Sequence, residues 1–240
     1  MSQPVAATSG LRERKKQRTR QRIADTAMRL FVERGFHGVT VAEIARAAEV
    51  SEQTVFNYFP TKEDLVYGRM ESFQEALLQA VRERPAGESI LEAFGRFVLP
   101  ARGLLADRQA DEQLRSVQRV IAESPALLAR ERQVHERHAE LLAELIRGET
   151  GVGGEDVRPW VAANAMIGVH RALVDHVRRG ALAGTPNRRL AGEVRQLGEQ
   201  ALAALARGLG DLSDWTTARS ARAEPAGADV ATDPAGRSAR

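Results

Sequence analysis

The chain has 240 residues, of which 43% are hydrophobic and 28% are charged, and its formal net charge at pH 7 is +3. This composition is typical of a globular protein with one or two domains. No run of the sequence approaches the ~18 consecutive apolar residues of a membrane span, so we expect no contact with a membrane. Cysteine is absent, which excludes disulfide bonds and thiolate metal sites, and we expect neither a metal nor a cofactor.

The N-terminal segment is polar and basic, unlike the apolar core of a secretion signal, so we expect a cytoplasmic protein. Residues 11–22, LRERKKQRTRQR, hold seven basic side chains against one acid. Basic groups at a helix start oppose the helix dipole, so a polyanionic partner explains them better than helix stability does. We predict that residues 1–14 form a flexible basic arm and that Arg18, Thr19 and Arg20 contact phosphates.

Two short helices joined by a tight turn are predicted next, after a longer first helix. Thr40 and Glu43 have the spacing of a capping box, which begins the first short helix. Ser51 caps the second short helix, and Pro60 ends it. This pattern is a helix-turn-helix.

The second short helix has two different faces on a helical wheel. We expect its inward face to hold Val55, Phe56 and Phe59 and its opposite face to hold Gln53, Thr54, Asn57 and Tyr58. Gln and Asn can bond both groups on the edge of adenine, and Thr and Tyr can meet a thymine methyl or a phosphate. The polar face therefore indicates a helix that reads DNA bases, the alternative being an ordinary solvated surface.

The context of these helices resembles the tetracycline-repressor (TetR) family of transcriptional regulators, over roughly Arg18 to Tyr67. The matching runs are TRQRIADTAMRLFVERG, GFHGVTV, the pair VS and YFPTKEDLV. The resemblance implies that the second short helix enters the major groove and that residues at Thr40 and at the start of the fourth helix hold phosphates. The full set of predicted DNA contacts is Arg18, Thr19, Arg20, Thr40, Ser51, Gln53, Thr54, Asn57, Tyr58, Thr61 and Lys62.

Two residues depart from the pattern of that family. Glu49 stands where the family usually has a glycine with positive φ, at a cost of about 1 kcal/mol. Phe56 stands where the family often has a tyrosine, so a hydroxyl contact with phosphate is lost.

The rest of the chain is rich in helix-forming residues, and the whole protein is predicted to be all-α. Thr61 caps a fourth helix that runs to about Arg84 and leaves the DNA-binding unit, and a turn at 84–89 follows it. Later helices are expected at about 90–98 and 114–121, from Pro125 to Gly148, over 157–179 and after Pro186. The predicted units are a basic arm (1–14), a helix-turn-helix DNA-binding domain (15–68, motif about 40–59), a ligand-binding and dimerisation domain (69–212) and a disordered tail (213–240).

Apolar residues of the last helix alternate spacings of four and three, which is the pattern of a helix-pairing seam. The seam runs through Leu190, Val194, Leu197 and Ala201. A helix in the core of one protomer would have the same pattern. The family resemblance implies a homodimer in which the last two helices of each protomer form a four-helix bundle.

Patterns of catalytic residues are missing, since the sequence has neither a phosphate-binding glycine loop nor an HExxH metal pair, and we predict that the protein is not an enzyme. Ligand contacts are expected from residues of the second domain, namely Phe94, Phe97, Arg119, His138, Asn164 and His170. The lining is mostly aliphatic, which favours an elongated apolar molecule over a planar cation, with Arg96 or Arg119 holding an anionic head group. The run RSVQRVIAESPALLAR (115–130) resembles the family's subgroup with an acyl-CoA-like ligand-binding domain, which implies an acyl-CoA or a fatty acid.

Together these features predict a ligand-responsive, sequence-specific DNA-binding regulator, a repressor that an effector releases from a palindromic operator. One alternative is a regulator of multidrug efflux that responds to hydrophobic drugs. Another is an architectural DNA-binding protein without an effector, and a third is an enzyme on a helical scaffold, which would need a polar, convergent cleft.

Overall fold

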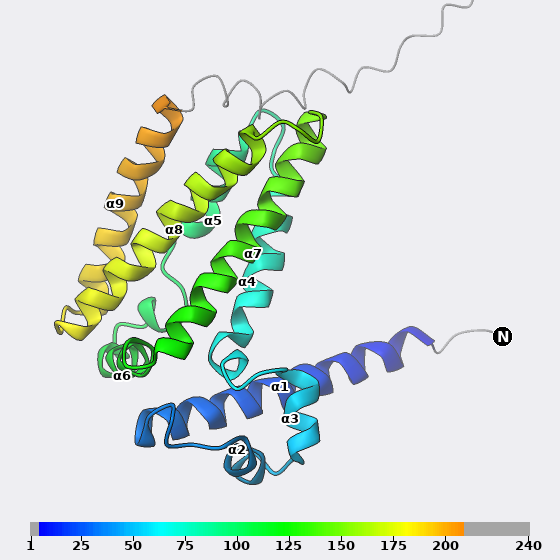
Figure 1. Ribbon diagram of the computed structural model, residues 1–240, viewed down its shortest axis with the longest axis vertical. Helices are drawn as coiled ribbons and strands as arrows, with labels where there is room; N and C mark the ends of the chain where they lie inside the picture. Colours follow the sequence, from blue (N-terminus) through cyan, green and yellow to red (C-terminus); the bar gives the residue numbers. More distant parts are fainter. Residues whose placement is uncertain (1–4, 209–240) are drawn as a thin grey trace, which may run out of the picture.

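The computed structural model describes residues 5–208, without the side chains of residues 5–13 and 69–71 (Figure 1). Within this range the chain forms nine α-helices and one short 3₁₀ helix and contains no strand, which confirms the predicted all-α class. The predicted disordered tail, 213–240, lies outside the described residues. None of the described helices is both long and apolar enough to cross a membrane.

Three helices form the unit at one end of the molecule, namely α1 (Val5–Arg34), α2 (Val41–Ala47) and α3 (Glu52–Tyr58) (Figure 1). Gly35 ends α1 with a φ of 75°, and its N–H donates to the Phe31 carbonyl at 2.8 Å. The α1 backbone is helical from Val5, and its first residues fall within the range 1–14 that the sequence predicts as a flexible basic arm.

The remaining helices form a bundle above this unit (Figure 1). They are α4 (Asp64–Arg82), α5 (Ile90–Val98), the 3₁₀ helix η1 (Gly103–Leu105), α6 (Asp111–Ala122), α7 (Pro125–Thr150), α8 (Arg158–Leu182) and α9 (Asn187–Gly208). Ser124 caps α7 by accepting from the Leu127 N–H, as its place before Pro125 predicts. The helix continues past Gly148 because Gly151 is the residue that adopts the left-handed conformation, with a φ of 68°.

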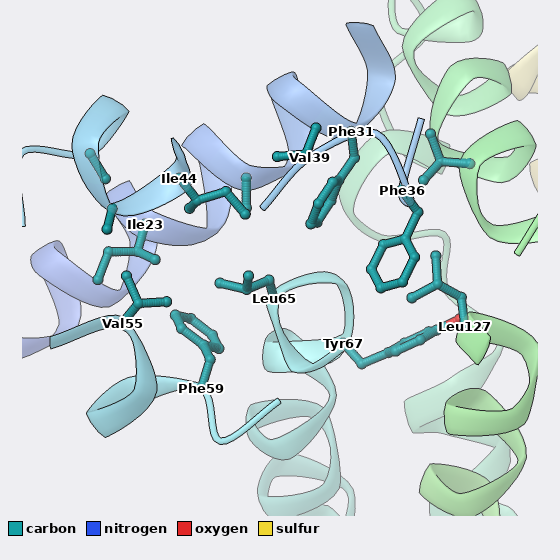
Figure 2. Close-up of a cluster of buried hydrophobic side chains, with 14 of the residues drawn as sticks. Ile23, Phe31, Phe36, Val39, Ile44, Val55, Phe59, Leu65, Tyr67 and Leu127 are labelled. Atoms are coloured by element: carbon teal, nitrogen blue, oxygen red, sulfur yellow. The ribbon is translucent and has the colours of Figure 1, made fainter. Parts of the chain in front are cut away.

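One hydrophobic core extends from the three-helix unit into the bundle (Figure 2). In that core Phe36, Phe59 and Tyr67 pack in the same cluster as Leu127 near the start of α7. Val120 and Ile121 at the end of α6 also belong to it. The two parts of the chain are therefore joined by packed side chains and not only by the α4 backbone.

A buried ionic network joins three helices of the bundle. Arg178 of α8 donates from one nitrogen to both carboxylate oxygens of Glu131 of α7, at 2.6 Å each. It also donates to Asp175 at 2.9 Å and to Gln118 of α6 at 3.2 Å. Burial raises the pKa of Glu131, and the charge of Arg178 acts in the opposite direction. The pair holds α6, α7 and α8 together just above the shared core.

The network leads to a stability prediction. Glu131→Gln should lower the free energy of unfolding by about 3 kcal/mol, because it leaves the Arg178 guanidinium buried without its main counter-charge. Glu140→Gln, on the same helix, removes an exposed pair with Arg137 and should cost less than about 1 kcal/mol. Urea unfolding at one fixed protein concentration measures both, and equal losses in the two variants would contradict the proposed importance of the buried network.

Candidate functional site

The start of α2 is held by the capping box that the sequence predicts. The Thr40 N–H and hydroxyl donate to one Glu43 carboxylate oxygen at 2.8 and 2.9 Å, and Thr40 Oγ1 accepts from the Glu43 N–H at 3.3 Å. These bonds, first that from the Thr40 backbone, and the nearby Arg34 guanidinium lower the pKa of Glu43 to about 2. The carboxylate is therefore ionised at neutral pH and keeps α2 in place.

The turn before α3 contains the positive φ that the family comparison predicts at this position. Glu49 has a φ of 53°, a conformation that side chains other than glycine adopt only at a cost. Ser51 then caps α3, accepting from the Thr54 N–H at 3.1 Å. The two features set the direction in which α3 leaves the turn.

The outward face of α3 carries two exposed amide side chains. Gln53 donates to Asn57 at 3.0 Å, so the two predicted base-reading groups are aligned with each other along the helix. Thr54 lies beside them, its hydroxyl 2.8 Å from that of Ser51. This pair of amides offers donors and acceptors to a base edge without a large rearrangement.

Phe56 and Tyr58 lie differently from our expectation. Phe56, predicted to face inward, is 44% exposed, whereas Tyr58, predicted to face outward, is half-buried against the shared core. At about 100° per residue these two positions flank the inward face, whose centre is Val55 and Phe59, at similar angles on opposite sides. Which flank is covered depends on neighbouring helices, and here the Tyr58 side is the covered one.

The basic residues of α1 divide into an exposed group and a packed one. Arg18 is exposed, and with Arg14, Lys15 and Arg22 it lines a shallow hollow on the surface of α1. The Arg20 guanidinium instead donates to the Gly68 carbonyl of α4 at 3.0 Å and lies 5.2 Å from the centre of the Phe59 ring.

Thr19 bonds within its own helix, its hydroxyl donating to the Lys15 carbonyl at 3.1 Å. Arg18 and its exposed neighbours therefore present the charge that a phosphate backbone would meet, while Arg20 packs α1 against α4.

Thr61 and Lys62, at the start of the fourth helix, make contacts inside the protein. Thr61 donates from its N–H and hydroxyl to Asp64 at 3.0 and 2.8 Å. The prediction that Thr61 caps the fourth helix is wrong, because α4 begins at Asp64 and its N-cap residue is Glu63, which makes no side-chain cap bond. The Lys62 ammonium donates to the Phe36 carbonyl at 2.6 Å and lies 4.3 Å from the centre of that ring, and burial lowers its pKa. Lys62 thus connects the start of α4 to the loop between α1 and α2.

Close packing between α3 and α4 requires a glycine. A Cβ atom added to Gly68 would lie 2.4 Å from the ring of Phe59, which follows directly after α3. The ring can reach α4 only because residue 68 has no side chain. The position of α3 is therefore set directly by α4.

The candidate ligand residues are only partly brought together. Phe97, His138 and His170 belong to a cluster of rings between α4, α5, α7 and α8, which Phe73 and His135 complete. Phe73 stacks on His170 at 5.0 Å and on His138 at 5.9 Å between ring centres. His135 lies 5.6 Å from His170, and Phe97 lies 5.2 Å from Phe73.

Two histidines of this cluster, His135 and His170, are held neutral. Burial, reinforced by the neighbouring histidines, lowers the pKa of His135 to about 3 and that of His170 to about 4. Phe94 is fully buried in the core. Asn164 donates to the Trp160 carbonyl at 2.9 Å, and Arg119 is exposed on α6.

Arg96, our other candidate for holding an anionic head group, forms a double contact with Glu88 at 2.8 and 2.9 Å. Two of the guanidinium nitrogens of Arg96 are therefore already bound to the Glu88 carboxylate.

A cleft that sequence periodicity does not reveal lies where the two parts of the chain meet. It occupies about 250 Å³ between the facing sides of α4 and α7, above the end of α3. We call it the α4–α7 cleft, and its principal lining residues are Phe59, Tyr67, Gly68, Arg130, Arg137 and His138. Among the six predicted ligand residues, His138 lines it. The only signal in the sequence is the repeat of arginine at 130 and 137, two turns apart on one helix face.

The predicted seam of α9 faces in two directions. Leu190 and Val194 are buried in the protomer itself, since Leu190 packs with Leu114 and Ala181. Leu197 is 40% exposed, and Ala201 is half-buried. Leu190 and Val194 therefore belong to the core of one protomer, which is the alternative to a helix-pairing seam, because α9 packs on α8 and on the α5–α6 connection.

Comparison with known proteins adds family information to this geometry. Residues 23–67 match the model of the bacterial regulatory proteins of the tetR family. The HTH-type transcriptional regulator TcmR of Streptomyces glaucescens is 34% identical over 155 residues, which are 62% of this chain and 69% of that protein. LuxR of Vibrio harveyi is 49% identical over 47 residues, 20% of this chain and 23% of that protein. The solved structure of the fatty acid degradation regulator FadR from Bacillus halodurans is 22% identical, covers 77% of this chain and 98% of its own, and has a TM-score of 0.50.

The exposed amides of α3 lead to a prediction about sequence reading. Gln53→Ala and Asn57→Ala should each reduce, by about 1–3 kcal/mol, the difference in binding free energy between the duplex that the protein recognises and a scrambled duplex. The reason is that a bidentate contact with a base is lost. Arg18→Ala should weaken binding to both duplexes equally and reduce the dependence on salt. Fluorescence anisotropy at several salt concentrations measures these effects, and unchanged discrimination in both alanine variants of α3 would contradict the assignment.

Proposed function

The chain belongs to the TetR family of bacterial regulatory proteins, and we propose that it is a repressor that leaves its operator when a small molecule binds the helical bundle. The observation that carries this proposal is the exposed amide face of α3, presented by two capped helices whose core continues into the bundle. Such a protein acts where bacterial DNA lies, in the cytoplasm. The operator is a palindrome, since a two-fold dimer places two identical reading helices in successive major grooves, about 34–36 Å apart.

Dimerisation is proposed through the exposed faces of α8 and α9. Leu197 of α9 and Leu182 at the end of α8 are each 40% exposed, so both are accessible to a second copy of the chain. Glycines at 168 and 192 leave open space where a side chain would stand, so another helix can approach closely there. The buried part of the seam positions α9, and the exposed part remains to meet a second copy.

The coupling between effector and DNA would run through α4 and the start of α7. The shared core includes Leu127 of α7, and Ser124 Oγ lies 3.4 Å from the His37 ring in the loop between α1 and α2. Arg130 of α7 also contacts Asp64 at 2.8 Å. An effector that prefers another position of α7 would change the distance between the two α3 helices, and its differential affinity would set the degree of release.

The effector is proposed to be a small apolar or acyl molecule. His135 and His170 of the ring cluster are neutral at pH 7, and most residues of the surrounding core of α4, α5, α7 and α8 are aliphatic. Such an interior favours an uncharged, elongated body over a cation, which would need acidic partners.

Release from DNA tests the function directly. A palindrome selected from random duplexes should bind the full chain, and a fatty acid should release it while a cationic dye should not. Fluorescence anisotropy of the labelled duplex reports both results. Release by dyes alone would favour regulation by hydrophobic drugs, and binding without any preference for sequence would favour an architectural protein.

Dimerisation is tested by a charge on the exposed seam. Leu197→Asp should dissociate the dimer and abolish binding to the palindrome, because a carboxylate would be buried between protomers without a partner. Val32→Asp, at a residue of α1 that is also exposed, is the matched control and should stay dimeric. Sedimentation at micromolar protein distinguishes the two states, and a dimeric Leu197→Asp variant would place the interface elsewhere.

A further inference from the structure

The α4–α7 cleft carries more positive charge than its structural role explains. Of the described residues that line it, three are arginines and one is an acid, Asp64. Arg130 contacts this acid through Nε and Nη2, each 2.8 Å from the same carboxylate oxygen. Among the described residues, Arg137, two turns further along α7, pairs with Glu140 on the exposed surface at 3.0 Å. The excess charge would attract an anion into the cleft.

A tyrosine ring also lines the cleft. Tyr67 is 7% exposed, and its hydroxyl oxygen is covered and has no hydrogen-bond partner among the described residues. The ring of Tyr67, and not its hydroxyl, therefore forms part of the cleft wall.

The inner end of the cleft is less polar. It is lined by Val134 and His138 of α7, and behind His138 lie the stacked rings of Phe73 and His170. The volume of about 250 Å³ is below the ~300–1,000 Å³ of pockets for drug-sized ligands. The cleft therefore fits a small molecule with one charged end and a short apolar body, and it is too small for a complete coenzyme A thioester.

We propose that the α4–α7 cleft binds a small amphiphilic carboxylate, whose head meets Arg130 and Arg137 and whose body lies against His138. This inference rests on the proposed function, because it locates the effector and names its class. The site lies between α4 and α7, at the junction with the DNA-binding unit, and the predicted contacts at Phe94, Asn164 and Arg119 are outside its lining.

The position of the site explains how binding reaches the DNA. The carboxylate of the ligand competes with Asp64 for Arg130, and Asp64 also accepts the hydrogen bonds of Thr61 in the turn that follows α3. Weakening the Arg130–Asp64 pair loosens this turn from α7. Helix α3 and the bundle then lose one of the contacts that set their relative position.

Binding of defined carboxylates to the full chain tests the site. The probes are octanoate and benzoate, with octanamide and benzamide as uncharged controls and inorganic phosphate as an anion without an apolar body. Isothermal titration calorimetry should show binding of the two carboxylates at least tenfold tighter than that of the amides, and no saturable binding of phosphate, because one charge-assisted contact corresponds to about this factor.

Two variants localise the binding. Arg137→Gln should weaken octanoate and benzoate binding about tenfold, while Arg132→Gln, exposed on α7 and outside the cleft lining, should leave it unchanged.

The outcomes separate this site from the proposed function. The proposed site is wrong if the protein binds its palindrome but binds neither carboxylate, or if Arg137→Gln binds the carboxylates as tightly as the wild type. The proposed function as a regulator would then still stand. If the carboxylates bind as expected and no duplex is bound in a sequence-dependent way, the proposed function is wrong and the cleft remains a binding site. Tighter operator binding in the presence of carboxylate would overturn the competition with Asp64.

Discussion

The packing of Phe59 against Gly68 is the contact on which the other features of this protein depend. It joins the end of α3 to α4, and a side chain at residue 68 would force these two helices apart. The same core includes Phe36 and Tyr67 and reaches Leu127 of α7 (Figure 2). Because close-packed interiors transmit displacement and do not absorb it, α3 cannot change its direction independently of the bundle.

Polar contacts around this core are of two kinds, and they differ in what they contribute. The Arg178–Glu131 pair is largely buried, so removing one partner would leave a costly charge inside the protein, and the partly buried Lys62 contacts a backbone carbonyl. The Arg130–Asp64 pair is partly open to solvent and faces a cleft, so another anion can replace one partner at little cost. The first kind maintains the fold, whereas the second is suited to a switch.

Several signals that act over one helical turn are formed as the sequence predicts. The capping box of Thr40 and Glu43, the Ser51 cap and the end of α1 at Gly35 are all formed as predicted, because each depends on hydrogen bonds between residues at most four apart. The end of α7 was misplaced by a few residues, since several glycines follow one another there and the sequence does not indicate which one adopts the positive φ.

The sequence by itself determined the all-α class, the two short helices of the reading unit and the polar residues on the outer face of α3. Only the tertiary structure decided that Tyr58 is covered while Phe56 is exposed, that Leu190 lies inside the protomer, and that the cationic group of Lys62 contacts a carbonyl. Helical periodicity defines which residues share a face, but the element that covers that face comes from a distant part of the chain. The α4–α7 cleft exists for the same reason, since its two walls are more than fifty residues apart in sequence and meet only when α7 folds back along α4.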